Sequence, residues 1–322
     1  MVGADDDDSG RALISVGVED VGGLGKIGVR LLGAFERACG YAFEPSKIRR
    51  VARAEGDALV TKAKSAAKAK KILAAAETEI EERAFRRLVA QEVQRQENLE
   101  RIAQKAAEEI REIPEAERQK DAPAIDDDWM MRFVGKAQEI KNEEMQRMWA
   151  RVVSGEVRKP GTYSLRALDC LSNMTQKDAL LFEKAVSLST VGPGGGRIFK
   201  LGDDTALPQF GLDYDKLLDL RSAGLLHDGD TLFVTYNMDK APNAPVVCFY
   251  HNALLQFFNF ARNPLKFQCL MLTAVGRELA QIVPPTTDMA YVGALAEQRA
   301  KNGFVTILQD LKSGVVTNFN PE

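Results

Sequence analysis

The stretch that decides the fold of this chain is residues 127–171, DDWMMRFVGKAQEIKNEEMQRMWARVVSGEVRKPGTYSLRALDCL. Its apolar residues recur at helical spacing in two runs, Trp129, Phe133, Ala137 and Ile140, then Met145, Met148, Trp149 and Val152. The acidic residues 126–128 favour the positive end of a helix dipole, and Asn142 is a good cap for the second run. Gly155 is the predicted end of that second helix. Ser164 can then cap a third helix, so the stretch predicts three short amphipathic helices.

A much longer helical pattern precedes this stretch, over residues 74–113, and Pro114 ends it. Its apolar residues recur every three or four positions, which is the spacing of a coiled-coil stripe. The strongest part of the stripe is Leu99, Ile102, Ala106 and Ile110. We expect a helical, coiled-coil-like region over residues 21–122. The four stripe residues are the predicted oligomer seam, either between copies of the chain or within a helical hairpin.

Residues 46–71 are helical in composition and strongly basic, with nine lysines and arginines against Glu55 and Asp57. Such a segment can follow the phosphates of a nucleic acid, or another anionic partner. The candidate contact residues are Lys47, Arg49, Arg50, Arg53, Lys62, Lys64 and Lys68. The alternative is pairing with the acidic residues 77–82 that follow, in a hairpin or between subunits.

Residues 1–42 contain two further segments. Residues 1–20 carry the run Asp5-Asp6-Asp7-Asp8 and predict a disordered acidic tail. Residues 21–42 combine apolar residues at helical spacing with six glycines, which let a helix approach its neighbour closely. We expect this segment to pack within the protein or an oligomer. The alternative is a helix lying on a membrane surface.

Residues 123–322 predict one compact α+β domain. Capping signals at Thr175–Asp178, Asp213 and Thr273 precede helical runs, and a further helix is expected over residues 291–301. Strand-like runs cover residues 232–236, 246–250, 266–272 and 304–308. The order of helix, glycine stop at Gly224, strand, strand and helix is similar to a winged-helix arrangement. The predicted fold is therefore mostly α, with a long helical N-terminal half and a smaller α+β, winged-helix-like part.

No catalytic constellation stands out in the sequence. The motif Gly23-x-Gly25-x-x-Gly28 lacks the preceding strand and the following acidic residue that a dinucleotide site needs. The two histidines, His227 and His251, have no nucleophile at a suggestive spacing, and residues 126–128 have no second metal-ligand group. The four cysteines form no CxxC pair, which indicates small buried thiols and a reducing cytoplasm. We expect no enzyme activity, cofactor or metal.

The charge distribution argues against a simple DNA reader. The formal net charge of the whole chain is -3, and the helix that would serve as a recognition helix begins with Asp213 and Asp215. A DNA-binding face is normally basic. A winged-helix-like domain used for protein contact fits better. No apolar run approaches the ~20 residues that span a bilayer.

The block of residues 127–171 resembles a widespread bacterial family of unknown function, as do the stretches EPSKIRRVARAEGDAL (44–59), QRQENLERIAQKA (94–106) and LTAVGREL (272–279). That family is similar to the abortive-infection protein alpha group, which is associated with bacterial defence against phage. The resemblance implies a bacterial cytosolic protein and a defence component, without catalytic or ligand residues. We therefore expect a non-enzymatic protein that oligomerises or binds a partner. The alternatives are a nucleic-acid-binding regulator using residues 47–71 and a membrane-active effector using residues 21–42.

Overall fold

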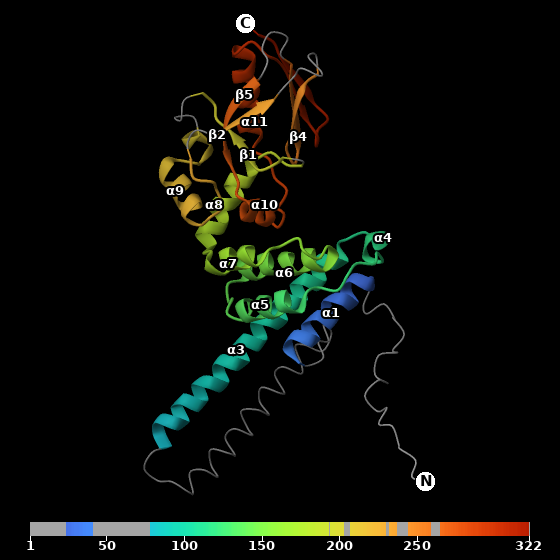
Figure 1. The fold of residues 1–322 in the computed structure, drawn as a ribbon, viewed down its shortest axis with the longest axis vertical. Coiled ribbons are helices and arrows are strands. Elements are labelled where there is room, and N and C mark those ends of the chain that lie inside the picture. The colour runs from blue at the N-terminus through green and yellow to red at the C-terminus, as the bar shows by residue number, and fades with distance from the viewer. Residues whose placement is uncertain are drawn as a thin grey trace, which may run out of the picture. The chain divides into compact units, whose positions relative to one another are not determined.

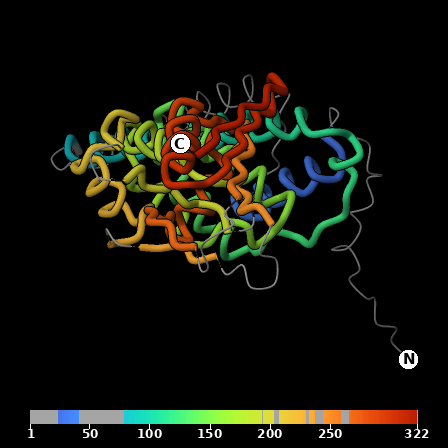
Figure 2. The backbone as a smooth tube through the Cα atoms, turned by 90° about the horizontal axis from the view of Figure 1, so that it is seen from above, coloured from blue at the N-terminus to red at the C-terminus, as the bar shows by residue number. Residues whose placement is uncertain are grey.

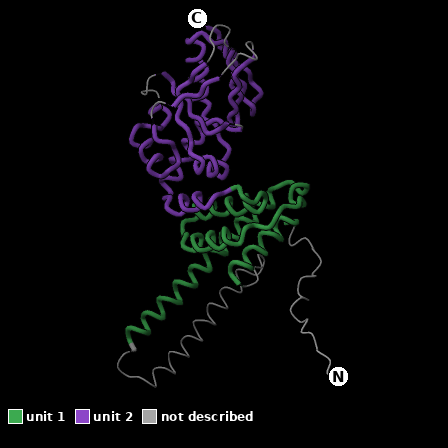
Figure 3. Tube along the Cα trace, viewed as in Figure 1, with its two compact units in different colours: residues 1–162 green, residues 163–322 purple. Residues whose placement is uncertain are grey.

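The structure is a computed structural model that describes residues 24–40, 78–192, 194–202, 207–229, 232–236, 244–258 and 265–321. The chain divides into two compact units, unit 1 (Met1–Thr162) and unit 2 (Tyr163–Glu322), shown in Figure 3. The boundary lies after residue 162 rather than after residue 122, where the change in composition predicted it, because the helices that follow residue 126 pack on the preceding helices. The acidic tail and the basic residues 47–71 lie outside the described residues.

Unit 1 is helical where it is described. Its helices are α1 (Gly25–Cys39), α3 (Thr78–Arg111), α4 (Glu115–Arg118), α5 (Asp127–Ala137) and α6 (Glu143–Arg158). The predicted caps are confirmed: the Asp126 side chain accepts a hydrogen bond from the Trp129 N–H at 2.8 Å, and Asn142 accepts one from the Met145 N–H at 3.0 Å. The predicted end at Gly155 is wrong. The buried residues on either side of Gly155 continue the apolar face of α6 and outweigh the ~1 kcal/mol cost of a helical glycine.

Aromatic rings form the centre of unit 1. The rings of Phe133 and Trp149 lie 5.2 Å apart in an edge-on arrangement, and Trp129 stacks on Phe133 at 5.4 Å. Phe35 of α1 meets Phe133 edge-on at 6.2 Å. Phe35, Phe133 and Trp149 are 0% exposed. The apolar stripe of residues 127–152 is therefore core, as its spacing predicts.

The C-terminal half of α3 belongs to the same core. Leu99, Ile102, Ala106 and Ile110 are 4%, 0%, 0% and 0% exposed. Helices α1, α5 and α6 of the same chain pack against α3. The predicted oligomer seam at these four positions is therefore corrected: the chain's own helices cover the stripe and leave it no surface for a second copy.

The described part of residues 21–42 is also folded into unit 1. Leu24, Ile27, Leu31, Ala34 and Phe35 are at most 3% exposed, and α1 lies beside the green segment that contains α4 (Figure 2). Gly25 has a φ of 60°, and a Cβ there would lie 3.0 Å from the Arg118 backbone oxygen. Close packing within the protein is therefore confirmed for this segment. The face that would enter a membrane is buried by the chain itself.

Unit 2 combines helices with two small antiparallel sheets. Its elements are α7 (Leu165–Asn173), α8 (Gln176–Ser187), β1 (Arg197–Phe199), a 3-10 turn (Pro208–Phe210), α9 (Tyr214–Ser222), β2 (Leu232–Tyr236), β3 (Val246–Phe249), β4 (Ala253–Phe258), β5 (Leu265–Met271), α10 (Ala274–Ala280), α11 (Met289–Lys301), β6 (Val305–Asp310) and β7 (Val316–Phe319). The predicted caps at Ser164, Thr175 with Asp178, Asp213 and Thr273 are all present.

The strands form one sheet in the order β1-β5-β2 and another in the order β3-β4-β6-β7. Val234 faces Phe267 in the first sheet, and Leu255 faces Leu308 in the second. The two sheets touch through Phe257 and Phe267, whose ring centroids lie 5.1 Å apart. Helix α11 packs against β4 and β6. Strands β1, β4 and β7 are additions to the predicted set; β4 lies in the most apolar stretch of the sequence, where length and composition alone do not distinguish strand from helix.

The segment LTAVGREL makes a tight joint in unit 2. The Thr273 hydroxyl donates to the Gly224 carbonyl at 2.6 Å and accepts from the Gly276 N–H at 2.9 Å. A Cβ at position 276 would collide with the Leu225 carbonyl oxygen. Only glycine allows α10 to approach the end of α9 this closely, so this stretch has a structural role.

Candidate functional site

The structure describes one of the two predicted sets of site residues, the seam residues of α3, but not the basic residues 47–68. Lys47, Arg49, Arg50, Arg53, Lys62, Lys64 and Lys68 all lie outside the described residues. The seam residues of α3 are core. Among the described residues, no group of three or more histidines, cysteines and acids could hold a metal ion.

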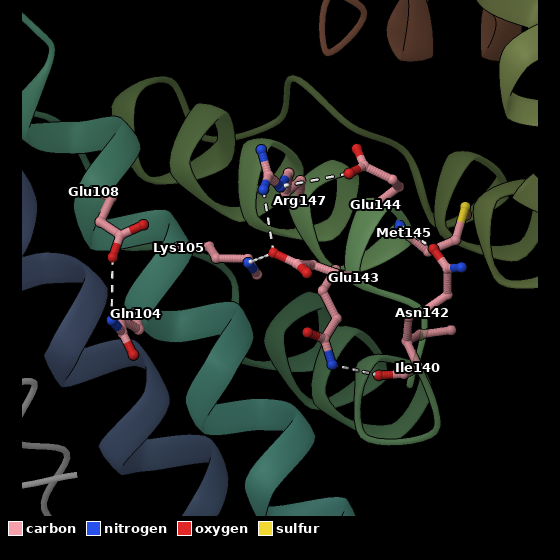
Figure 4. Close-up of polar contacts among 10 residues, drawn as sticks. Gln104, Lys105, Glu108, Ile140, Asn142, Glu143, Glu144, Met145 and Arg147 are labelled. Carbon is pink, nitrogen blue, oxygen red and sulfur yellow. Dashed lines mark hydrogen bonds and ion pairs between the residues drawn. The ribbon is translucent and has the colours of Figure 1, made fainter. Parts of the chain in front are cut away.

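The sequence block that carries the family resemblance ties α6 to α3 through charged side chains (Figure 4). Lys105 of α3 donates to Glu143 at 3.1 Å, and Arg147 donates to the same carboxylate at 3.1 Å. The hydrogen bond from Lys105, followed by that from Arg147, lowers the pKa of the Glu143 carboxyl. Arg151 of α6 donates to Glu109 of α3 at 3.0 Å, so a second ion pair joins the same two helices. These pairs align the two helices.

Buried amides complete this part of the block. Asn98 of α3 is 1% exposed and donates to the Gln138 carbonyl at 2.8 Å. Gln146 of α6 is 2% exposed and donates to the Ile140 carbonyl at 2.9 Å. Both carbonyls lie just beyond the end of α5, where a helix leaves acceptors without helical partners. The two amides therefore hold the α5–α6 connection in place, and the motif is a structural signature.

Burial makes the thiols of Cys170, Cys248 and Cys269 poor nucleophiles. Burial raises the pKa of the Cys248 thiol to about 12 and that of Cys170 to about 11. Such thiols stay protonated at neutral pH, whereas a nucleophilic cysteine needs a lowered pKa. Burial lowers the pKa of His251. Cys248 and Cys269 are buried as predicted, while Cys39 and Cys170 are only half-buried.

The N-terminal half of α3 presents a different kind of surface. It projects beyond α5 and α6 (Figure 1). Ile80 is 73% exposed and Leu88 is 58% exposed. These two residues and Ala84 recur every four positions, so they share one side of the helix, which we call the bare face of α3 (Ile80, Ala84 and Leu88, with Phe85 at its edge).

The bare face continues the buried stripe of the same helix. Counting in helical steps, Ile80, Ala84 and Leu88 lie in line with Leu99 and Ile102. The sequence pattern includes both halves of the stripe, because Ile80 and Phe85 belong to the same apolar series. The pattern does not reveal which half the rest of the chain covers. Among the residues that the structure describes, the C-terminal half is covered and the N-terminal half is not.

The charges on this part of α3 change sign along the helix, and Glu81, Arg83 and Arg87 are the ones beside the bare face. Acidic residues come first, Glu79, Glu81 and Glu82, and basic residues follow, Arg83, Arg86 and Arg87. Arg86 donates to Glu82 at 2.6 Å within the helix. An exposed apolar stripe with charges at its edges is the composition of a helix–helix contact surface. This surface is the best-supported candidate site on the described part of the chain.

Comparisons with known proteins identify a family but no characterised relative. None of the helices in the described residues has the length and apolar content to cross a membrane. No curated protein matches the chain, and no solved structure matches it either. The model of a family described as a protein of unknown function (DUF2806) matches residues 82–296, which include the block of residues 127–171. That match covers well over half of the chain, which therefore belongs to the DUF2806 family.

Proposed function

We propose that this protein is a non-enzymatic interaction protein that self-associates through the bare face of α3. The observation that carries the proposal is the exposure of Ile80 and Leu88, 73% and 58%, on a helix whose other half forms a core. Isolated exposed apolar residues are normal on proteins, but a stripe aligned on a projecting helix is characteristic of a contact surface.

A second copy of the chain is the occupant that the spacing favours, because Ile80 and Leu88 lie equally far from Ala84 along the helix. In an antiparallel pair centred on Ala84, Ile80 of one copy lies opposite Leu88 of the other. Glu82 and Arg86 lie on the far side of each helix, where they pair with each other. Such a pair has two-fold symmetry, and the apolar stripe of each copy covers that of the other. Because the contact is short, we expect a concentration-dependent dimer.

The test is the mass of the full-length protein in solution over a range of concentrations, measured by sedimentation velocity. We expect the I80D/L88D double substitution to abolish the concentration dependence, because two buried carboxylates would face each other without partners. A90D is the matched control, since Ala90 is exposed on the same helix but lies off the bare face. An unchanged association of I80D/L88D would refute the proposed interface.

A role in phage defence is the biological extension of the proposal. Its support is the resemblance of residues 127–171 to the family similar to the abortive-infection protein alpha group. If self-association serves defence, cells that express the native chain should yield fewer phage plaques than cells that express I80D/L88D. Equal plaque numbers with native chain and with an empty vector would count against a defence role while leaving self-association intact.

A nucleic-acid-binding regulator is the second candidate, supported by the topology of unit 2. Elements α8, β1, α9, β2 and β5 follow in the order helix, strand, helix, strand, strand, and β5 lies between β1 and β2 in the sheet. That order and pairing are typical of a winged-helix domain, with β3 and β4 inserted between the last two strands. The topology supports the winged-helix-like interpretation of this unit.

The surface of α9 favours a protein partner for such a domain. Tyr214 and Leu218 are 63% and 43% exposed, and the exposed Asp215 and Asp219 lie beside them. An apolar and acidic helix is poorly suited to a phosphate backbone. Mobility-shift assays with DNA and RNA at low salt separate the candidates: binding lost on changing Arg49, Arg50, Arg53, Lys62 and Lys64 to Glu would establish the regulator, and no binding at low salt would remove it.

A further inference from the structure

Strand β7 lies at the edge of the second sheet of unit 2. The sheet has the order β3-β4-β6-β7, so β7 pairs with β6 on one side and with no described strand on the other. A strand at an edge presents unpaired backbone N–H and C=O groups, which another strand can bind. At the opposite edge, the Val191 N–H donates to the carbonyl of Phe249 in β3 at 2.7 Å. The β7 edge has no such partner among the described residues.

The register of β6 and β7 shows which backbone groups face this edge. The two strands pair antiparallel over residues 306–309 and 316–319. Just before β7 begins, the Asp310 N–H of β6 donates to the Val315 carbonyl at 2.9 Å. Hydrogen-bonded and non-hydrogen-bonded pairs alternate along an antiparallel ladder, so every second residue after Val315 bonds to β6. The residues in between, Val316 and Asn318, direct their N–H and C=O groups away from β6, toward the edge.

The side chains at this edge are exposed and carry no charge. Val315 and Val316 are 58% and 52% exposed. The stretch SGVVTNFNP (313–321) contains no acidic or basic residue. Many natural edge strands carry a charged side chain, often a lysine, that prevents pairing with another strand. Strand β7 lacks this protection, so a second copy of β7 would meet no electrostatic repulsion.

Strand β7 is complementary to a second copy of itself. In an antiparallel pair centred on Thr317, Val316 of one copy lies opposite Asn318 of the other. These are the residues with outward backbone groups, so each such pair exchanges both of its hydrogen bonds. The same register places Thr317 opposite its own counterpart and Val315 opposite Phe319. Pairs of threonines, and pairs of an aromatic with a β-branched residue, stabilise a sheet across strands.

We propose that the edge of β7 is a contact surface for β7 of a second copy, which pairs with it antiparallel around Thr317. The second sheets of the two copies then form one continuous sheet with two-fold symmetry. This contact is separate from the bare face of α3, because β7 belongs to unit 2. The strand is only four residues long, so the contact is far smaller than the ~1,000 Å² of a stable interface. A β7 pair is therefore transient, and its detection needs a method that traps short-lived contacts.

Disulfide trapping in the full-length protein tests the register. In the proposed pair the two Thr317 Cα atoms lie about 4.5 Å apart, a distance that a disulfide spans. We expect T317C to form a disulfide-linked dimer under mild oxidation, measured by non-reducing gel electrophoresis against the native chain with its four cysteines. N318C is the matched control, since Asn318 is also exposed on β7. Its two copies lie more than about 7 Å apart in this register, so we expect T317C to be trapped at least ten times faster.

A proline at position 316 tests the hydrogen bonds of the pair. V316P removes an N–H that points away from β6, so it leaves the ladder between β6 and β7 in place. We expect V316P/T317C to lose most of the trapping while its urea unfolding stays close to that of T317C. Placing T317C in the I80D/L88D background separates the two proposed contacts. We expect trapping to persist in that background, because β7 takes no part in the α3 contact.

Three results would overturn the proposal. Equal trapping of T317C and N318C would indicate random collisions. A T317C protein that stays monomeric would leave the edge to a strand of another protein. Loss of trapping in the I80D/L88D background would show that β7 does not pair by itself, whereas an unchanged mass of I80D/L88D rejects the α3 contact alone. If V316P/T317C does not fold, the comparison of T317C with N318C decides the question.

Discussion

The two halves of α3 carry the same kind of apolar stripe but differ in solvent exposure. In the C-terminal half, Ile102 and Ile110 are 0% exposed beneath helices of the same chain. In the N-terminal half, Ile80 is 73% exposed. The comparison shows that an apolar stripe on a helix specifies a contact but not the partner. Four substitutions test the contrast, ordered by their expected effect on the free energy of unfolding.

The largest effect is expected for I102D, in the buried half. Ile102 is 0% exposed, and an aspartate there would leave a carboxylate in the core without a partner. We expect a loss of more than about 4 kcal/mol, enough to unfold unit 1. Helical content by circular dichroism and a urea titration measure it. Native-like unfolding of I102D would show that the stripe is not core.

A smaller effect is expected for N98A, which removes the amide that satisfies the end of α5. The Gln138 carbonyl would lose its 2.8 Å hydrogen bond in a buried setting. Leaving such a group unsatisfied costs about 1–3 kcal/mol. The midpoint of urea unfolding measures the loss. Asn98→Asp is a useful companion, because it keeps the shape and removes the donor; full stability in both variants would contradict the assigned role.

A still smaller effect, dependent on pH, is expected for E143Q. Contacts with Lys105 and Arg147 lower the pKa of the Glu143 carboxyl in the folded protein. Its contribution is therefore present above the pKa of an unfolded glutamate, about 4.3, and is lost as the pH falls through the lower native pKa. We expect E143Q to melt slightly below the native protein at pH 7 and together with it in strong acid. A gap that is constant with pH would exclude a charge effect.

The smallest effect on unfolding is expected for L88D, in the exposed half. Leu88 is 58% exposed, so the new carboxylate stays in water. The free energy of unfolding, from a urea titration, should change by less than about 0.5 kcal/mol. This measurement is made below the concentration at which the protein associates. A large loss of stability in the monomer would mean that Leu88 is part of a core, and the contrast between the two halves of α3 would fail.

The deeper lesson concerns which features could be predicted from local sequence. The helix caps at Asp126, Asn142 and Thr273 are correct because a cap and the backbone N–H that donates to it lie three residues apart. The helical spacing of Trp129 and Phe133 correctly predicts a core face. Strand β4 was not predicted, because a short apolar run has the same composition in a strand and in a buried helix.

The candidate sites were harder to predict than the fold. Exposure of Ile80 and Leu88 depends on where the rest of unit 1 ends, which no spacing rule contains. The contact between Arg299 and Phe267 joins α11 and β5, which lie apart in the chain. A lone Arg299 in the sequence looks like an ordinary surface charge near the end of a helix.

The amino-acid sequence alone determines the helical spacing of apolar residues and the helix caps, because each depends on residues a few positions apart. It also determines the family to which the chain belongs, because that match depends on a contiguous pattern. Only the tertiary structure shows that α5 and α6 belong to unit 1. It also shows that the stripe residues Leu99 and Ile110 are buried whereas Ile80 and Leu88 are exposed. In unit 2 it shows that Arg299 is buried against Phe267. The physical reason is that burial is a property of the assembled chain. A side chain's own identity sets how much it gains from being covered, whereas its distant neighbours set whether it is covered.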